Sequence, residues 1–153
     1  MAGIGGADYR SGALERLAEA SLLLRQARFG GSAYLAGRAV EGMLRAVIWK
    51  SDPDYAGGRK SLETGHSLRD MLKLVRNLGT LRDSEVRDVI AADVQRVARL
   101  WWNNMRFLPT RKVQAQWHAL REVGGKRTMK QATEEFYNAC SAVIKRCEVL
   151  WHS

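Results

Sequence analysis

Apolar residues recur every three or four positions through most of this chain, and only two prolines interrupt it. Such spacing places the apolar side chains on one face of an α-helix, because the helical repeat is close to 3.6 residues. The pattern favours an all-α fold and gives no convincing strand. The clearest repeat, in residues 32–50, is carried by Ala36, Val40, Met43, Leu44 and Val47.

The chain organisation follows from where this repeat starts and stops. Residues 51–65 hold Pro53 and three glycines without periodicity, so we expect a long loop there, and residues 1–7 are expected to be a flexible N-terminus. We expect residues 8–153 to form one domain, an antiparallel bundle of about five to six helices. The expected helices span about 8–28, 32–50, 67–78, 84–107, 111–122 and 129–151.

Capping residues and prolines predict the helix ends. We expect Gly30-Gly31 to end the first helix and Ser32 to cap the second. Pro109 is expected to stop the fourth helix, and Thr128 to cap the last one. The buried face expected on the first helix carries Leu14, Leu17, Ser21 and Leu24.

The formal net charge of +9 is concentrated in one segment. Residues 96–130 contain nine Lys and Arg residues and a single acid, Glu122, whereas the rest of the chain is close to neutral. Clustered cations attract phosphates, so nucleic acid is the expected partner, with an acidic protein surface next and no membrane. Apart from Arg106, considered below, the basic residues expected at this interface are Arg96, Arg99, Arg111, Lys112, Arg121, Lys126, Arg127 and Lys130.

Two stretches carry a family resemblance. Residues 32–50 read SAYLAGRAVEGMLRAVIWK and are followed after the loop by GHSLRDMLKLV at 65–75, while LWWNNMRFLP stands at 100–109. In helix order, over about residues 10–150, the chain resembles the HEPN family of small helical domains from prokaryotic defence, toxin–antitoxin and stress systems. The resemblance implies a HEPN-like bundle that usually dimerises. Its active members are metal-independent ribonucleases with an Arg, a short spacer and a His before the last helix.

The chain departs from that motif. Arg106 best matches the family Arg, but no His follows it at the required spacing. Arg111 and His118, with six residues between them, have an allowed spacing and form the alternative catalytic pair. Arg59 and His66 have the same spacing but lie in the early loop region, where His66 is expected to help start the third helix or to hydrogen-bond to a neighbouring carboxylate. Cleavage would need an acid or base near the RNA 2′-hydroxyl and a cation on the phosphate.

The missing His favours binding over cleavage. We therefore expect a HEPN-like binding or assembly module of a prokaryotic defence or toxin–antitoxin type complex. It would contact RNA in preference to DNA through residues 96–130, as a homodimer or as a subunit of a larger complex. One alternative is an endoribonuclease that uses Arg111 and His118 with Arg106 in support. The other is a subunit that binds protein only.

Two tryptophans precede Arg106. Adjacent residues on a helix point about 100° apart, so one of Trp101 and Trp102 is expected in the core. The other is expected to anchor a protein interface, in preference to stacking on a base.

Glu41 lies at or beside an apolar stripe, where a carboxylate is costly unless it is paired. One interpretation is that it orients Arg106 across the bundle. The other, slightly favoured, is an arginine partner at the edge of the core, with Arg38 and Arg45 as candidates.

The sequence indicates no metal site and no cofactor, because the three histidines are scattered. Cys140 and Cys147 would lie about 10 Å apart along one helix, too far for a disulfide, and are expected to be reduced core thiols. No run approaches the roughly 18 apolar residues of a membrane span, and the N-terminus does not resemble a signal peptide. A cytoplasmic protein is therefore expected.

Overall fold

The computed structural model describes residues 3–51, Leu68, Met71 and 84–153, and these residues form an all-α helical bundle, as predicted. Their helices are α1 (Gly6–Arg25), α2 (Phe29–Ser51), α6 (Ser84–Leu100), the 3-10 helix η1 (Asn103–Phe107), α7 (Thr110–Ala119) and α8 (Met129–Trp151).

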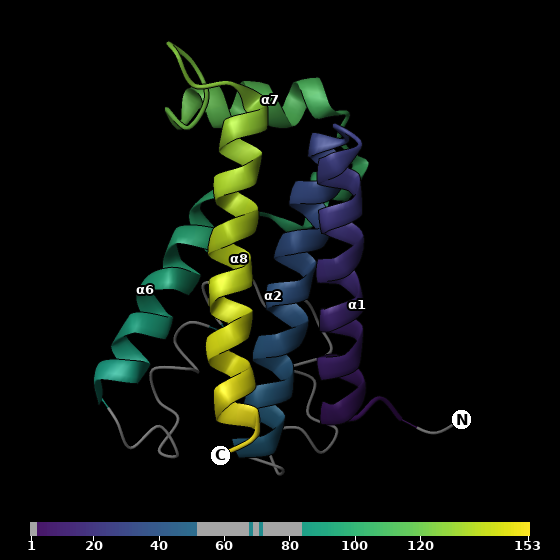
Figure 1. The fold of residues 1–153 in the computed structure, drawn as a ribbon, viewed down its shortest axis with the longest axis vertical. Coiled ribbons are helices and arrows are strands. Elements are labelled where there is room, and N and C mark those ends of the chain that lie inside the picture. The colour runs from purple at the N-terminus through teal and green to yellow at the C-terminus, as the bar shows by residue number, and fades with distance from the viewer. Residues whose placement is uncertain (1–2, 52–67, 69–70, 72–83) are drawn as a thin grey trace.

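Helices α1, α2, α6 and α8 run roughly along the long axis of the molecule (Figure 1). α1 packs on α2, and α8 packs on α2, α6 and α1. The pairs α1–α2, α6–α8 and α1–α8 are antiparallel, whereas α2 and α8 run parallel, which corrects the expectation of a wholly antiparallel bundle. α7 instead lies across the upper end of the bundle, where it contacts α2. The path from α6 to α8 therefore passes over one end of the molecule.

Helix α2 lies at the centre of the core because α1, α8, α7 and η1 all pack against it. Every member of its predicted apolar stripe is buried. α1 approaches α2 closely at Gly42, where an added Cβ would lie 3.3 Å from the Tyr9 carbonyl oxygen and 3.4 Å from Ala13 Cβ.

This close approach corrects the predicted face of α1 in part, because Leu17 packs against the core as predicted but is only half-buried. The helix buries the small residues Ala13 and Ala20 against α2, while Leu14 is 37% exposed. A leucine at the line of closest contact would hold the two helices apart. The sequence prediction chose the leucines by hydrophobicity, whereas the packing selected the alanines by size.

The predicted turn between α1 and α2 is also corrected. α1 ends at Arg25, and the chain reverses through Ala27, which has a φ of 57°. Gly30 and Gly31 lie inside α2, so they do not end α1. Ser32 is not a cap either, because its hydroxyl is buried and donates to the Ala20 carbonyl oxygen at 2.8 Å.

The fourth predicted helix is broken well before Pro109. α6 ends at Leu100, and Trp102 is extended, with φ −145° and ψ 154°. The Trp101 indole is buried against Gly37 of α2 and donates from Nε1 to the Tyr34 carbonyl oxygen at 3.0 Å. The Trp101 amide still donates to the Val97 carbonyl oxygen at 3.0 Å, so the chain leaves the helical path at the extended Trp102.

A second tryptophan holds α7 across the end of the bundle. Trp117 is fully buried, its ring packs on Phe136 of α8, and its Nε1 donates to the Leu100 carbonyl oxygen at 2.9 Å. That bond satisfies a carbonyl left free at the end of α6. α7 begins at Thr110 with Pro109 as its N-cap, one residue earlier than predicted.

The last helix matches its prediction. α8 spans Met129–Trp151, and the Thr128 hydroxyl accepts from the Gln131 amide at 3.2 Å in the expected capping box. Cys140 and Cys147 are buried and free, also as expected.

Between residues 52 and 83, the structure describes only Leu68 and Met71. The predicted helix at 67–78 and the predicted loop at 51–65 lie outside the described residues, apart from Ser51, Leu68 and Met71. Ser51 is the last residue of α2, and Leu68 and Met71 are buried in the core.

Substituting Gly37 tests the packing of Trp101. We expect Gly37→Ala to lower the free energy of unfolding by about 1–3 kcal/mol, because the new methyl group overlaps the indole. Gly12→Ala is the matched control, since Gly12 is also inside a helix and its Cβ would meet nothing within 4 Å. It should raise the same quantity by about 0.5–1 kcal/mol. Urea unfolding measures both, and equal stability of the two variants would contradict the packing described.

Candidate nucleic-acid interface

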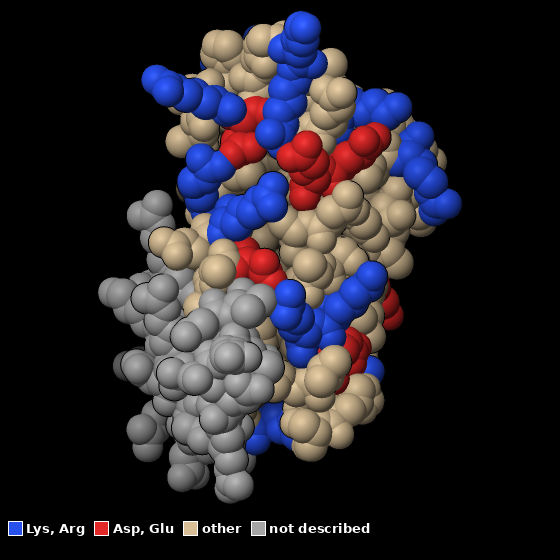
Figure 2. Space-filling view, turned by 60° about the vertical axis from the view of Figure 1, so that its left-hand side comes forward, with Lys and Arg blue, Asp and Glu red and all other residues tan. Residues whose placement is uncertain are grey.

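The basic segment of residues 96–130 occupies the upper end of the molecule. It runs from the last turns of α6 through η1 and α7 to the first turn of α8. Figure 2 shows long Lys and Arg side chains projecting from this end, with acidic side chains set between several of them. The segment is therefore not uniformly positive, and the ion pairs decide which of its cations are available.

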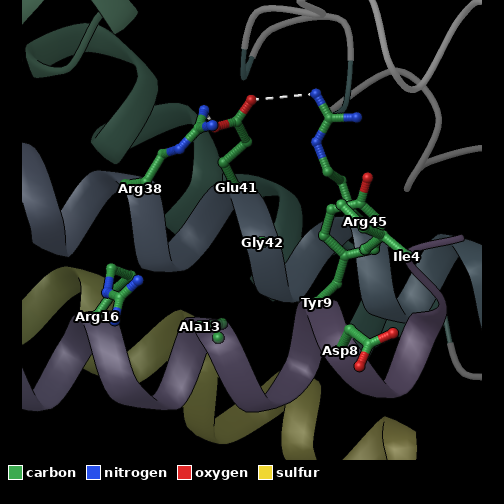
Figure 3. Close-up of a pocket in the computed structure, with 10 residues that line it drawn as sticks. Ile4, Asp8, Tyr9, Ala13, Arg16, Arg38, Glu41, Gly42 and Arg45 are labelled. Atoms are coloured by element: carbon green, nitrogen blue, oxygen red, sulfur yellow. Dashed lines mark hydrogen bonds and ion pairs between the residues drawn. The ribbon is translucent and has the colours of Figure 1, made fainter. Parts of the chain in front are cut away.

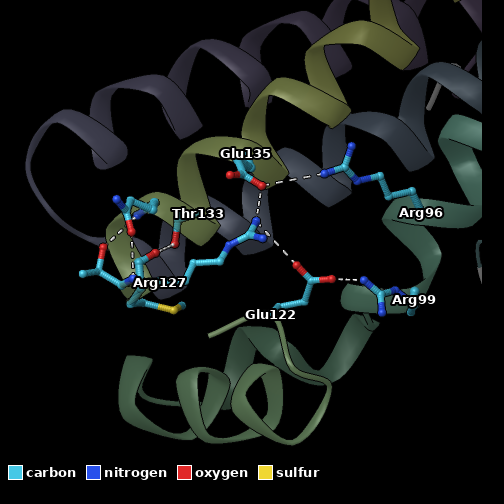
Figure 4. Close-up of polar contacts among 9 residues, drawn as sticks. Arg96, Arg99, Glu122, Arg127, Thr133 and Glu135 are labelled. Carbon is cyan, nitrogen blue, oxygen red and sulfur yellow. Dashed lines mark hydrogen bonds and ion pairs between the residues drawn. The ribbon is translucent and has the colours of Figure 1, made fainter. Parts of the chain in front are cut away.

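Three of the predicted phosphate contacts belong to an ion-pair network (Figure 4). Arg99 and Arg127 both pair with Glu122, the latter at 3.6 Å. Arg127 also pairs with Glu135 of α8, and Arg96 reaches the same carboxylate at 3.8 Å. The Glu122 side chain is only 13% exposed, so the network ties α6, the α7–α8 connection and α8 together.

A fourth predicted contact, Lys130, lies 4.0 Å from Glu134 one turn along α8, and both side chains are exposed. Such a surface pair contributes little energy and would release its lysine readily. Lys130 is therefore more available to a ligand than the three arginines of the network.

Within residues 96–130, five exposed cations have no ion pair with any described residue. They lie on η1, on α7 and in the connection to α8, and no Asp or Glu occurs between residues 94 and 121. We call this set the free cations, and its members are Arg106, Arg111, Lys112, Arg121 and Lys126.

The backbone of the α7–α8 connection presents two of the free cations. Arg121, at φ 61°, follows the end of α7. Gly124 and Arg127 exchange two backbone hydrogen bonds of 3.0 Å, which place Gly125 and Lys126 at the tip of a tight turn. Gly124 and Gly125 adopt the positive φ angles of 126° and 60° that this turn requires.

The alternative catalytic pair lies on one helix. Arg111 and His118 are seven residues apart on α7, which puts them on one face about 10 Å apart along the axis. His118 Nδ1 lies 3.1 Å from the Val123 carbonyl oxygen. Because a carbonyl oxygen can only accept, Nδ1 carries a proton and Nε2 is left with the lone pair in the neutral ring. The side chain is thus oriented but stands two turns from Arg111.

Arg106 stacks on its neighbour and is not held by Glu41. Its guanidinium carbon lies 4.6 Å from the centre of the Phe107 ring, and both residues are exposed. Sequence reasoning missed Phe107, which directly follows Arg106 and stands two residues before Pro109, where a turn can leave a side chain exposed.

Glu41 pairs within its own helix, at the edge of a cavity of about 330 Å³ between α1 and α2 (Figure 3). One carboxylate oxygen accepts from Arg38 and the other from Arg45 Nη2 at 3.2 Å. The interpretation with Arg38 and Arg45 as partners is therefore correct, and the orientation of Arg106 by Glu41 is wrong. The Arg45 side chain is 9% exposed and also lies 5.9 Å over the Tyr9 ring.

The two tryptophans separate as expected. Trp101 is the core residue, at 6% exposure, so it offers no surface anchor. Trp102 is half-buried and packs against the core, and its role as an interface anchor stays a prediction.

Other chemistry finds little support among the described residues. Burial raises the pKa of the Cys147 thiol to about 12 and that of Cys140 well above its usual value, so neither is a thiolate near neutral pH. No cluster of three or more metal-binding side chains occurs in the part of the chain that is described. Within the same residues, no helix is long and apolar enough to cross a membrane.

Comparisons with known proteins do not assign the chain to a family. No protein-family model matches it, and neither the curated proteins nor the solved structures give a significant match. The functional argument therefore depends on the site itself and on the motif resemblance in the sequence.

Removing Glu122 tests the ion-pair network. We expect Glu122→Gln to lower the free energy of unfolding by about 1–2 kcal/mol, because Arg99 and Arg127 lose a shared, largely buried carboxylate but remain partly solvated. Glu134→Gln, which removes an exposed acid, should change it by less than about 0.5 kcal/mol. Urea unfolding at low salt compares them, and an equal effect of both substitutions would contradict the network.

Proposed function

We propose that this protein is a HEPN-like nucleic-acid-binding module that contacts RNA through the five free cations. In this proposal it serves as a binding or assembly part of a cytoplasmic prokaryotic defence or toxin–antitoxin type complex, as a homodimer or as one subunit. The observation that carries the binding function is the partition of charge at the upper end of the bundle. Four predicted contacts have acidic partners, whereas Arg106, Arg111, Lys112, Arg121 and Lys126 have none among the described residues.

Charge balance supports an anionic partner for this surface. Residues 100–121 contain four basic residues and no acid, and none of the four has an ion pair with a described residue. Neutralising the free cations with phosphates would release condensed counterions from the nucleic acid, which is the main source of such binding. The exposed amides of Asn103, Asn104, Gln114 and Gln116 add hydrogen-bonding groups on the same elements.

The HEPN part of the proposal depends on sequence motifs together with the fold class. The all-α bundle is compatible with the resemblance, and Arg106 stands in the short element before α7. The same resemblance is the reason for preferring RNA to DNA. The proposal that the protein does not cleave follows from the missing His after Arg106.

A second candidate is the endoribonuclease that uses Arg111 and His118. One observation favours it: the contact with Val123 fixes the protonated nitrogen of His118 and leaves Nε2 able to act as a base. Another observation opposes it: Arg111 and His118 lie about 10 Å apart along the axis of α7. The backbone of a single chain therefore does not place both side chains beside one phosphate. A paired copy would have to supply the missing proximity.

Lys112→Gln tests binding by the free cations. For single-stranded RNA, we expect weaker binding and a log–log salt slope that is smaller by about 0.7, because one phosphate contact is lost. Lys145→Gln is the matched control, since Lys145 is exposed on α8 without an ion pair among the described residues. Fluorescence anisotropy over a salt series measures both. An unchanged slope in Lys112→Gln, or the same decrease in the control, would contradict the proposed surface.

His118→Ala separates the two candidate functions. A binding module leaves labelled RNA intact with or without His118, in the presence of a metal chelator. The endoribonuclease would cleave RNA under these conditions, and His118→Ala would slow cleavage by about 100-fold or more. His152→Ala is the control because His152 is exposed at the far end of α8. Cleavage by the unmodified protein that depends on His118 alone would overturn the binding-only proposal.

A further inference from the structure

Phe107 combines an exposed aromatic ring with a rigid support. Phe107 is 71% exposed. Among the described residues, it is the only aromatic one in the set of exposed large hydrophobic residues. It belongs to η1, where the neighbouring Met105 is 2% exposed and the Leu108 amide donates to the Met105 carbonyl oxygen at 3.0 Å. The turn is therefore anchored in the core while its ring faces solvent.

A cation already contacts one face of the Phe107 ring. The Arg106 guanidinium lies over the ring at 4.6 Å, a favourable arrangement for a cation and an aromatic face. The large exposed fraction of Phe107 leaves room for a second flat group on the opposite face. A nucleobase is such a group, and stacking on an aromatic side chain tolerates any base.

The surroundings decide between a base and an apolar protein partner. Arg106 precedes the ring directly, and Arg111 and Lys112 follow within five residues, on the first turn of α7. All three are free cations. An apolar docking site would be expected to adjoin other exposed apolar side chains, whereas this ring is flanked by charges of one sign.

We propose, on the basis of the proposed function, that Phe107 is a stacking platform for an unpaired base of single-stranded nucleic acid. Arg106, Arg111 and Lys112 contact the phosphates on either side of that base. A duplex keeps the faces of its bases covered by their neighbours, so it can use the cations but not the ring. The site therefore prefers single strands, and the ring supplies a part of the affinity that does not depend on salt.

The test compares Phe107→Ala with Leu120→Ala, which removes another exposed apolar side chain, 40% exposed, at the end of α7. A short single-stranded RNA carrying 2-aminopurine and a duplex of the same sequence are the probes. We expect Phe107→Ala to weaken single-strand binding by about 5- to 100-fold, as for the loss of one stacked base. Its salt slope and its duplex affinity should stay unchanged, and Phe107→Tyr should restore binding and the change in 2-aminopurine fluorescence.

The outcomes distinguish this inference from the proposed function. If Phe107→Ala binds single strands like the unmodified protein while Lys112→Gln still weakens binding, the stacking platform is wrong and the binding surface stands. The platform is also wrong if Phe107→Ala weakens single strands and duplex equally, or no more than Leu120→Ala does. If the unmodified protein shows no salt-dependent binding to either probe, the proposed function itself is wrong.

Discussion

Packing of the Trp101 ring against Gly37 joins the end of α6 to α2, the central helix of the core. The indole fits only because Gly37 has no side chain, and its Nε1 is satisfied by the Tyr34 carbonyl oxygen. α6 ends at Leu100, directly before this residue, and Trp117 of α7 donates to the Leu100 carbonyl oxygen. These two tryptophans hold α7 across the end of the bundle, so its polar side faces solvent. The candidate site is a consequence of that crossing.

The same crossing divides the basic segment into two functional groups. Glu122 stands where α6, the α7–α8 connection and α8 meet, and it pairs with Arg99 and Arg127 there. These arginines fasten the end of α7 to the bundle. The cations of η1 and α7 are exposed and have no ion pair with any described residue. The basic segment thus contains two kinds of cation: arginines that hold helices together through ion pairs, and exposed cations that are available to a ligand.

Patterns of local origin could be predicted from the sequence, and interactions between distant residues could not. The apolar stripe of α2 and the capping box of Thr128 are fixed by near neighbours, and both are correct. Ser32 was predicted to be an N-cap because serine is common at that position, but its hydroxyl donates to the Ala20 carbonyl oxygen of α1. The packing of Trp101 on Gly37 and the partners of Glu122 likewise depend on residues far along the chain. For the site, the segment and Arg106 were predicted, while Phe107 and the pairing that removes Arg99 and Arg127 were not.

The central claim is that nucleic acid binds on η1 and the solvent-facing side of α7. Ultraviolet crosslinking of the unmodified protein to single-stranded RNA, followed by mass spectrometry of the crosslinked peptides, tests it most directly. The account predicts crosslinks in peptides that contain Phe107 or the Arg111–Lys112 pair, and their loss as salt is raised. Crosslinks confined to α1 or to the C-terminal half of α8, with residues 103–120 unmodified, would contradict it.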